Sequence, residues 1–187
     1  MFSKEELNAR VREYFEYADL HAAYDESRDV YLMLTSCSSK VGTLVIKMIV
    51  KDDLIIVIAT CPTKVDTNDA EAMCRVAEYL HRATYGMKIG SFDFDFNDGE
   101  AQFRTSLLVK DALPSNDMLG MLLATGPSMW TRYGDGFFNV AFMGADPKEA
   151  AESSSNEGLI ALLESVLASK RAAEAEQKGD TSDDEAA

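Results

Sequence analysis

The sequence is poor in the residues that build metal centres and disulfide frameworks. It has three widely spaced cysteines, Cys37, Cys61 and Cys74, and two histidines, His21 and His81, which belong to no zinc-binding or catalytic pattern. Structural zinc sites and disulfide frameworks need cysteine and histidine ligands at defined spacings. We therefore expect three small buried apolar thiols, and no metal or other cofactor.

Basic residues and long apolar runs are also scarce. The chain has 18 Lys and Arg against 32 Asp and Glu, a formal net charge of −14, whereas phosphate backbones and anionic membranes attract clustered positive charge. No apolar run approaches the roughly 18 residues of a membrane span. The opening segment Met1–Leu7 is charged where a signal peptide is apolar. We expect a cytoplasmic protein that binds neither nucleic acid nor membrane.

The first part of the chain has the patterns of one helix and three strands. Ser3 precedes Glu6 by three residues, a capping box that predicts a helix over about residues 4–18. Stretches rich in Val, Ile and Leu follow, separated by short polar turns, and they predict consecutive antiparallel strands. The stretch 54–58 is apolar at every position, so its strand should be central or covered by helices. The predicted strands are residues 30–37, 41–50 and 54–60.

Two more helical regions follow. Thr67 or Asn68 caps a helix that runs to about residue 85 and ends at Gly86. Its buried face is expected to carry Met73, Ala77, Leu80 and Thr84. Beyond Pro114 a third helix begins, and Gly126-Pro127 should break or kink it, because proline lacks the backbone N–H of a helix interior. Pro127 then opens a separate segment.

Between these helices, residues 90–105 have the pattern of a β-hairpin. Three phenylalanines alternate with two aspartates, and Asp98-Gly99 suits a two-residue type I′ turn. A turn at that point places Phe94 opposite Phe103, Phe96 opposite Ala101 and Asp93 opposite Arg104.

The same segment begins like a calcium-binding loop, with Asp93, Asp95 and Asn97 at alternate positions. The sixth position is Asp98 instead of glycine, and the twelfth is Arg104 instead of a bidentate glutamate. The hairpin interpretation is therefore favoured, with the carboxylates solvated and paired with arginine.

Two apolar groups are candidates for binding a partner. Methionine adapts to varied surfaces, and Met118 and Met121 lie near Trp130 in the third helical region; the alternative is that they fill the core. Leucines recur at helical spacing near the C-terminus, where they can pack on their own domain or join two chains. We expect the partner-binding residues to be Met118, Met121, Trp130, Leu159, Leu162 and Leu163.

Three stretches resemble the bacterial YbjN family: Arg75–Gly86, Phe92–Arg104 and Gly144–Ala150. The resemblance covers about half of the chain, and the order of elements extends it over about residues 5–150. It implies a fold like that of the type III secretion chaperones and a role among candidate regulators of sensory transduction. The family generally has no known enzymatic activity or cofactor. The shared motifs are structural ones, a turn, alternating phenylalanines and a helix stop, so the resemblance carries over no functional residue.

The sequence thus predicts an α+β fold in which helices flank an antiparallel sheet of about five strands, a three-stranded meander plus a hairpin. We expect a domain over residues 1–150, a linker and amphipathic helix over 151–175, and a disordered acidic tail over 176–187. The expected function is a non-enzymatic, homodimeric protein-binding module. The alternatives are a dedicated type III secretion chaperone, or a small-ligand sensor or enzyme with a pocket between the hairpin and the helix of Trp130 and Tyr133.

Overall fold

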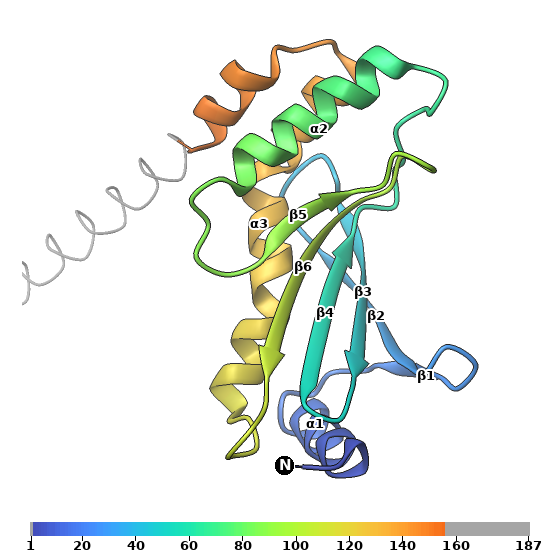
Figure 1. The fold of residues 1–187 in the computed structure, drawn as a ribbon, viewed down its shortest axis with the longest axis vertical. Helices are drawn as coiled ribbons and strands as arrows, with labels where there is room; N and C mark the ends of the chain where they lie inside the picture. Colours follow the sequence, from blue (N-terminus) through green and yellow to red (C-terminus); the bar gives the residue numbers. More distant parts are fainter. Residues whose placement is uncertain (1, 156–187) are drawn as a thin grey trace, which may run out of the picture.

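The computed structural model describes residues 2–155, which form an α+β fold of one antiparallel sheet and its covering helices (Figure 1). The predicted fold class is confirmed. A further helical stretch, residues 147–155, follows α3 and crosses residue 150, where we expected the domain to end. In chain order the elements are α1 (Lys4–Tyr17), β1 (Ala23–Asp25), β2 (Val30–Ser36), β3 (Thr43–Val50), β4 (Leu54–Thr60), α2 (Ala70–Thr84), β5 (Ser91–Phe94), β6 (Ala101–Leu108) and α3 (Asn116–Phe142).

The sheet has six strands in the order β1-β2-β3-β4-β6-β5, and every neighbouring pair is antiparallel. The three predicted strands of the meander are confirmed as β2, β3 and β4. The strand that the sequence did not predict is β1, whose three residues are too few to show alternation. As expected for its apolar sequence, β4 lies in the middle of the sheet.

The N-terminal caps of α1 and α2 can be identified from their hydrogen bonds. Ser3 caps α1 as predicted, because its side chain accepts from the Glu6 N–H while the Glu6 carboxylate accepts from the Ser3 N–H at 2.8 Å. The predicted cap of α2 was wrong by one or two residues, since Asp69 accepts from the Ala72 N–H at 2.9 Å. The prediction that Met73 and Leu80 are buried is confirmed, whereas Ala77 and Thr84 are only half-buried. The buried face of α2 is rotated from the predicted one and consists of Ala72, Met73, Val76, Tyr79, Leu80 and Ala83.

The predicted break at Gly126-Pro127 was wrong, because α3 is one continuous helix of 27 residues. Hydroxyls reinforce the turns around the proline: Thr125 donates to the Met121 carbonyl at 2.6 Å and Ser128 to the Ala124 carbonyl at 2.8 Å. Gly126 marks a close approach to the sheet, since a Cβ there would lie 2.6 Å from the Ala59 Cβ. Tertiary packing therefore outweighs the poor helix propensity of glycine and proline.

The hairpin register differs from the predicted one by two residues. Phe92 lies opposite Phe103 and Phe94 opposite Ala101. The turn is wider than a two-residue loop, because the Asp95 N–H donates to the Glu100 carbonyl at 2.9 Å. Its position is fixed by Gly99, at φ +71°, whose carbonyl accepts from the Val65 N–H at 3.0 Å. A shift of two keeps each side chain on its predicted face.

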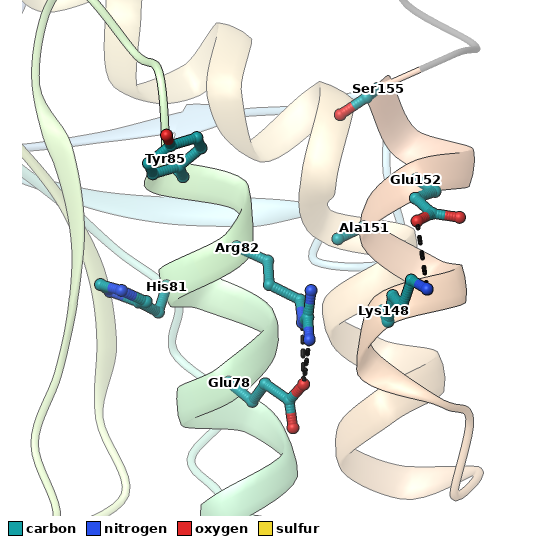
Figure 2. Close-up of a pocket in the computed structure, with 8 residues that line it drawn as sticks. All are labelled: Glu78, His81, Arg82, Tyr85, Lys148, Ala151, Glu152 and Ser155. Atoms are coloured by element: carbon teal, nitrogen blue, oxygen red, sulfur yellow. Dashed lines mark hydrogen bonds and ion pairs between the residues drawn. The ribbon is translucent and has the colours of Figure 1, made fainter.

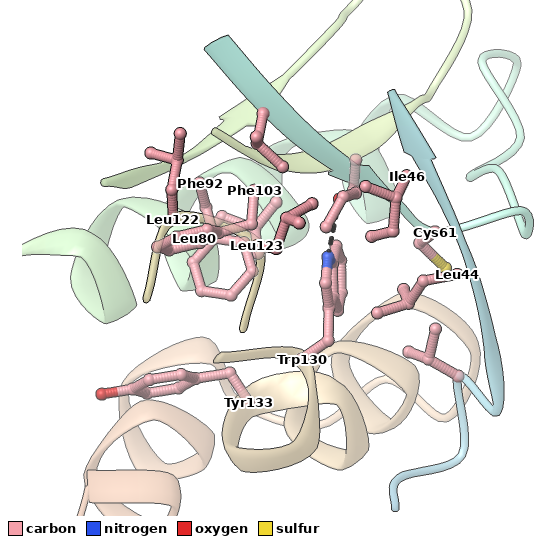
Figure 3. Packing of buried hydrophobic residues seen from close by; sticks show 14 of the residues in the cluster. Leu44, Ile46, Cys61, Leu80, Phe92, Phe103, Leu122, Leu123, Trp130 and Tyr133 are labelled. Atoms are coloured by element: carbon pink, nitrogen blue, oxygen red, sulfur yellow. Dashed lines mark hydrogen bonds between the residues drawn. The ribbon is translucent and has the colours of Figure 1, made fainter. Parts of the chain in front are cut away.

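The hydrophobic core lies on one face of the sheet, beneath the helices (Figure 3). Trp130 of α3 is completely buried there, and its ring stands edge-on to Phe92 with centroids 5.1 Å apart. α3 packs on β4 and β6, α1 on β3, and α2 on β5 and α3. α1, α2 and α3 therefore cover the same face of the sheet. No helix among the described residues covers the opposite face.

Candidate binding surfaces

The uncovered face of the sheet is aliphatic. Its side chains alternate along the strands with those of the core, and the register places Leu34 beside Val45, Ile49 beside Ile56, and Leu54 beside Leu108. The two outermost leucines, Leu34 and Leu108, are 73% and 55% exposed. We call this set the open face: Leu32, Leu34, Val45, Ile49, Leu54, Ile56, Ile58 and Leu108.

Positive charge lies within the open face. Lys47 sits between Leu32 and Ile58 in the sheet, and Arg104 lies on the other side of Ile58. Arg104 is paired, because its Nε donates to an Asp93 carboxylate oxygen at 2.7 Å. Lys47 forms no ion pair with a carboxylate of residues 2–155, although its charge contributes to lowering the pKa of the Asp98 carboxyl. The open face thus combines branched aliphatic side chains with a lysine whose charge can meet an acidic group of a partner.

One end of the open face adjoins an open strand edge. β5 pairs with β6 only from Ala101 to Arg104, so the second half of β6 has no described neighbour on that side. Backbone groups alternate in direction along an antiparallel strand, and those of Ser106 and Leu108 point to this edge. A partner strand could continue the sheet there.

The residues predicted to bind a partner are scattered. Met118 and Met121 are 47% and 58% exposed on one side of α3, so they are surface residues, not core filler. Trp130 lies in the core, where its indole N–H donates to the Ala59 carbonyl at 2.9 Å, and it is not available to a partner. Leu159, Leu162 and Leu163, and the predicted tail over 176–187, lie outside the described residues.

A cleft of about 780 Å³ lies between α2 and the helical residues 147–155 (Figure 2). Its charged side chains are paired within their own helices, Arg82 with Glu78 at 2.7 Å and Lys148 with Glu152 at 4.0 Å. His81, which also lines the cleft, is exposed. This volume is in the range of small-ligand sites, but the described charges neutralise one another instead of converging on a ligand.

Beneath this cleft, a buried hydroxyl network joins three helical segments. The Tyr79 hydroxyl of α2 donates to the Tyr133 carbonyl of α3 at 2.6 Å and lies 3.2 Å from the Ser154 hydroxyl oxygen. From the outside, Arg132 donates to the carbonyls of Ser154 and Ser155 at 3.2 and 2.9 Å. These bonds fix residues 147–155 against α2 and α3.

The acidic hairpin forms no metal site. The expected pairing of Asp93 with Arg104 is confirmed, although the two lie diagonally in the corrected register. Asp98 is ion-paired with Lys64, which lowers the pKa of the Asp98 carboxyl. Nowhere in the described part of the chain do three or more potential ligands gather as a metal site requires. The carboxylates act in ion pairs and turns.

The thiols differ from the expectation of three buried ones. Cys61 is buried, and burial raises its pKa to about 11. Cys37 is half-buried, while Cys74 lies on the exposed side of α2 because the true buried face of that helix is rotated. Nucleophilic thiols are accessible with a depressed pKa, so Cys61 is a structural residue.

The arrangement of the elements can be compared with solved structures. The fold resembles that of YbjN. The crystal structure of YbjN, described as a candidate transcription regulator from E. coli, matches with a TM-score of 0.47 and 11% sequence identity, over 66% of this chain and 84% of that one. No family model and no curated protein sequence matches the chain.

No helix within residues 2–155 is both long enough and apolar enough to cross a bilayer.

Proposed function

We propose that this protein is a non-enzymatic binding module that takes up an apolar segment of another protein on the open face of its sheet. The observation that carries the proposal is the set of eight aliphatic side chains on a sheet face with no covering helix among residues 2–155. Contiguous apolar surface of this kind is typical of protein interaction sites. A cytoplasmic regulator, as the resemblance implies, would use such a site to hold its target.

The chemistry of the face favours an amphipathic partner helix that carries an acidic residue. A helix offers an apolar stripe to a flat aliphatic surface, and a carboxylate beside that stripe can reach Lys47. A second copy stacked face to face would instead place two Lys47 ammonium groups at the centre of the interface, where like charges are unfavourable. The expected homodimer, if formed, should therefore use another surface.

The test is capture of the partner by matched variants. L34D/L108D places two charges on the open face, while F142D/M143D places two charges at equally exposed apolar positions at the end of α3. The wild type and the α3 variant should retain the same stoichiometric protein from a host lysate, and the open-face variant should lose it. Circular dichroism checks that both variants are folded.

A second comparison tests the charge. K47E should weaken binding of the captured protein several-fold, whereas K110E, an exposed lysine just beyond β6, should not. Equal capture by the wild type and L34D/L108D would contradict the open face as the binding site. Capture of no protein by the wild type would contradict the binding function itself.

Two alternatives make different predictions. A dedicated secretion chaperone would retain one secreted protein and no other. A small-ligand sensor would use the cleft between α2 and residues 147–155, so a ligand should raise the melting temperature of the wild type and of L34D/L108D but not of R82A, which removes a cation from the cleft.

A further inference from the structure

A second apolar surface runs along α3, separate from the open face. Five residues recur at helical spacing along one side of α3. Thr131 and Asp135, which accept hydrogen bonds from the turn that joins β2 and β3, lie on an adjoining side of the helix. We call this set the α3 stripe: Met118, Met121, Thr125, Met129 and Arg132.

Thr125, Met129 and Arg132 of the α3 stripe form one wall of a groove. The other wall is the connection between α2 and β5, which contributes Tyr85, Met87 and Ile89, and the enclosed volume is about 430 Å³. Tyr85 and Ile89 are exposed, as are Met118 and Met121 further along the stripe. Among residues 2–155, no segment lies over this groove.

The described chain ends beside Arg132, at one end of the same groove. Arg132, the last residue of the α3 stripe, donates hydrogen bonds to the carbonyls of Ser154 and Ser155. In Figure 2, Ser155 and Tyr85 lie toward the same end of their helices. The described chain therefore ends beside the groove, and only residues 156–158 separate Ser155 from Leu159 in the sequence.

The sequence that follows has the length and pattern to cover the stripe. Leu159, Leu162, Leu163 and Val166 recur at helical spacing. As a helix, residues 156–167 would extend about 18 Å, at 1.5 Å per residue, and the α3 stripe from Arg132 to Met118 extends about 21 Å. An antiparallel arrangement would bring Val166 next to Met121.

We propose that residues 156–167 dock intramolecularly on the α3 stripe, with their leucines against its methionines. Methionine suits this contact because its flexible side chain adapts to the shape of its neighbours. Attachment at one end of the groove gives the segment a high effective concentration over the stripe, far above that of a separate molecule. The segment thus covers an apolar surface that would otherwise be open to other chains.

Cysteine cross-linking tests the arrangement in the full chain. Cys37 and Cys74 are replaced by serine, and buried Cys61 is kept. M121C/V166C should form an intramolecular disulfide many times faster than L34C/V166C, in which the first cysteine is equally accessible but lies on the open face. Disulfide-linked dimers would mean that a second copy occupies the stripe and would overturn the proposal. Equal rates in the two variants would overturn it as well.

Hydrogen exchange supplies a measurement without cross-links. L162D/V166D should speed exchange of the amides of residues 86–89 several-fold, because the segment no longer covers that wall. A161D/S165D adds the same charge on the opposite side of the predicted helix and should leave these amides protected. Identical exchange in the wild type and both variants would refute docking, and restored protection only in the presence of host lysate would assign the stripe to an external protein.

Discussion

The indole N–H of Trp130 donates a hydrogen bond to the carbonyl oxygen of Ala59 at 2.9 Å, joining the middle of α3 to the central strand of the sheet. Since Trp130 is fully buried, this bond is made without access to water. W130F removes the donor and leaves a small cavity, so it should lower the free energy of unfolding by about 1–3 kcal/mol. Urea denaturation measures the change.

F142L is the matched control for this substitution. Phe142 is exposed near the end of α3, and its replacement should alter stability by less than about 0.5 kcal/mol. Equal effects of W130F and F142L would contradict the role of Trp130 in attaching α3 to the sheet.

Gly126 and Gly120 lie in the same helix but in different surroundings. A Cβ at Gly126 would lie 2.6 Å from the Ala59 Cβ, whereas at Gly120 the nearest atom would be the Tyr14 hydroxyl at 3.1 Å. Alanine favours a helix by about 1 kcal/mol over glycine, but overpacking costs about 1–3 kcal/mol. G126A should therefore lower the melting temperature and G120A should leave it nearly unchanged. A stabilising G126A would mean that α3 lies farther from the sheet.

The corrected hairpin register predicts unequal effects of two phenylalanines. Phe92 is buried opposite Phe103, while Phe96 is in the turn and 58% exposed. F92A should destabilise the protein by about 3–5 kcal/mol, and F96A by less than about 1 kcal/mol. The register first predicted, with Phe96 opposite Ala101, requires a large effect of F96A, so chemical denaturation of the two variants distinguishes the registers.

Cys61 should make stability depend on alkaline pH. Burial raises its pKa to about 11 in the folded protein, whereas an unfolded cysteine titrates near pH 8.5. Between these values the unfolded chain loses a proton that the folded one retains, so stability falls as pH rises, with a slope of at most about 1.4 kcal/mol per pH unit. Denaturation curves of C61A should have a shallower dependence over pH 8.5–11.

Reaction with a thiol reagent gives an independent check on the cysteines. At pH 8 the exposed Cys74 should react first and Cys61 only after unfolding. Rapid labelling of Cys61 in the folded protein would contradict its burial.

Local patterns were sufficient to predict much of the fold. The capping box at Ser3 and the runs of branched residues in β2, β3 and β4 are signals contained within a few neighbouring residues, and each element formed where expected. The hairpin register was not local, because it depends on the contact between Gly99 and Val65, more than thirty residues earlier in the chain. Gly126 of α3 likewise lies close to Ala59, which is distant in the sequence, and helix propensity does not include a contact of this kind.

The candidate site was less predictable than the fold. The exposure of Met118 and Met121 agrees with a surface role, but Trp130 was grouped with them on sequence proximity alone, and its direction on the helix is inward. A signal for the open face was present in the uniformly apolar stretch Leu54–Ile58. It indicated a strand with two apolar faces, but only the structure shows that the helices of residues 2–155 cover just one of them.

The position of α3 near the end of the chain has a consequence during synthesis. The core face of β2, β3 and β4 is complete once residue 60 has left the ribosome, but the helix that covers it ends at Phe142. At about 5–20 residues added per second, the last residue of α3 is synthesised roughly 4–16 s after residue 60. During this interval α3 is missing from the core face, which α1 covers only in part, and no described helix covers the other face. The nascent chain, more than the complete protein, is therefore the form that needs protection from aggregation.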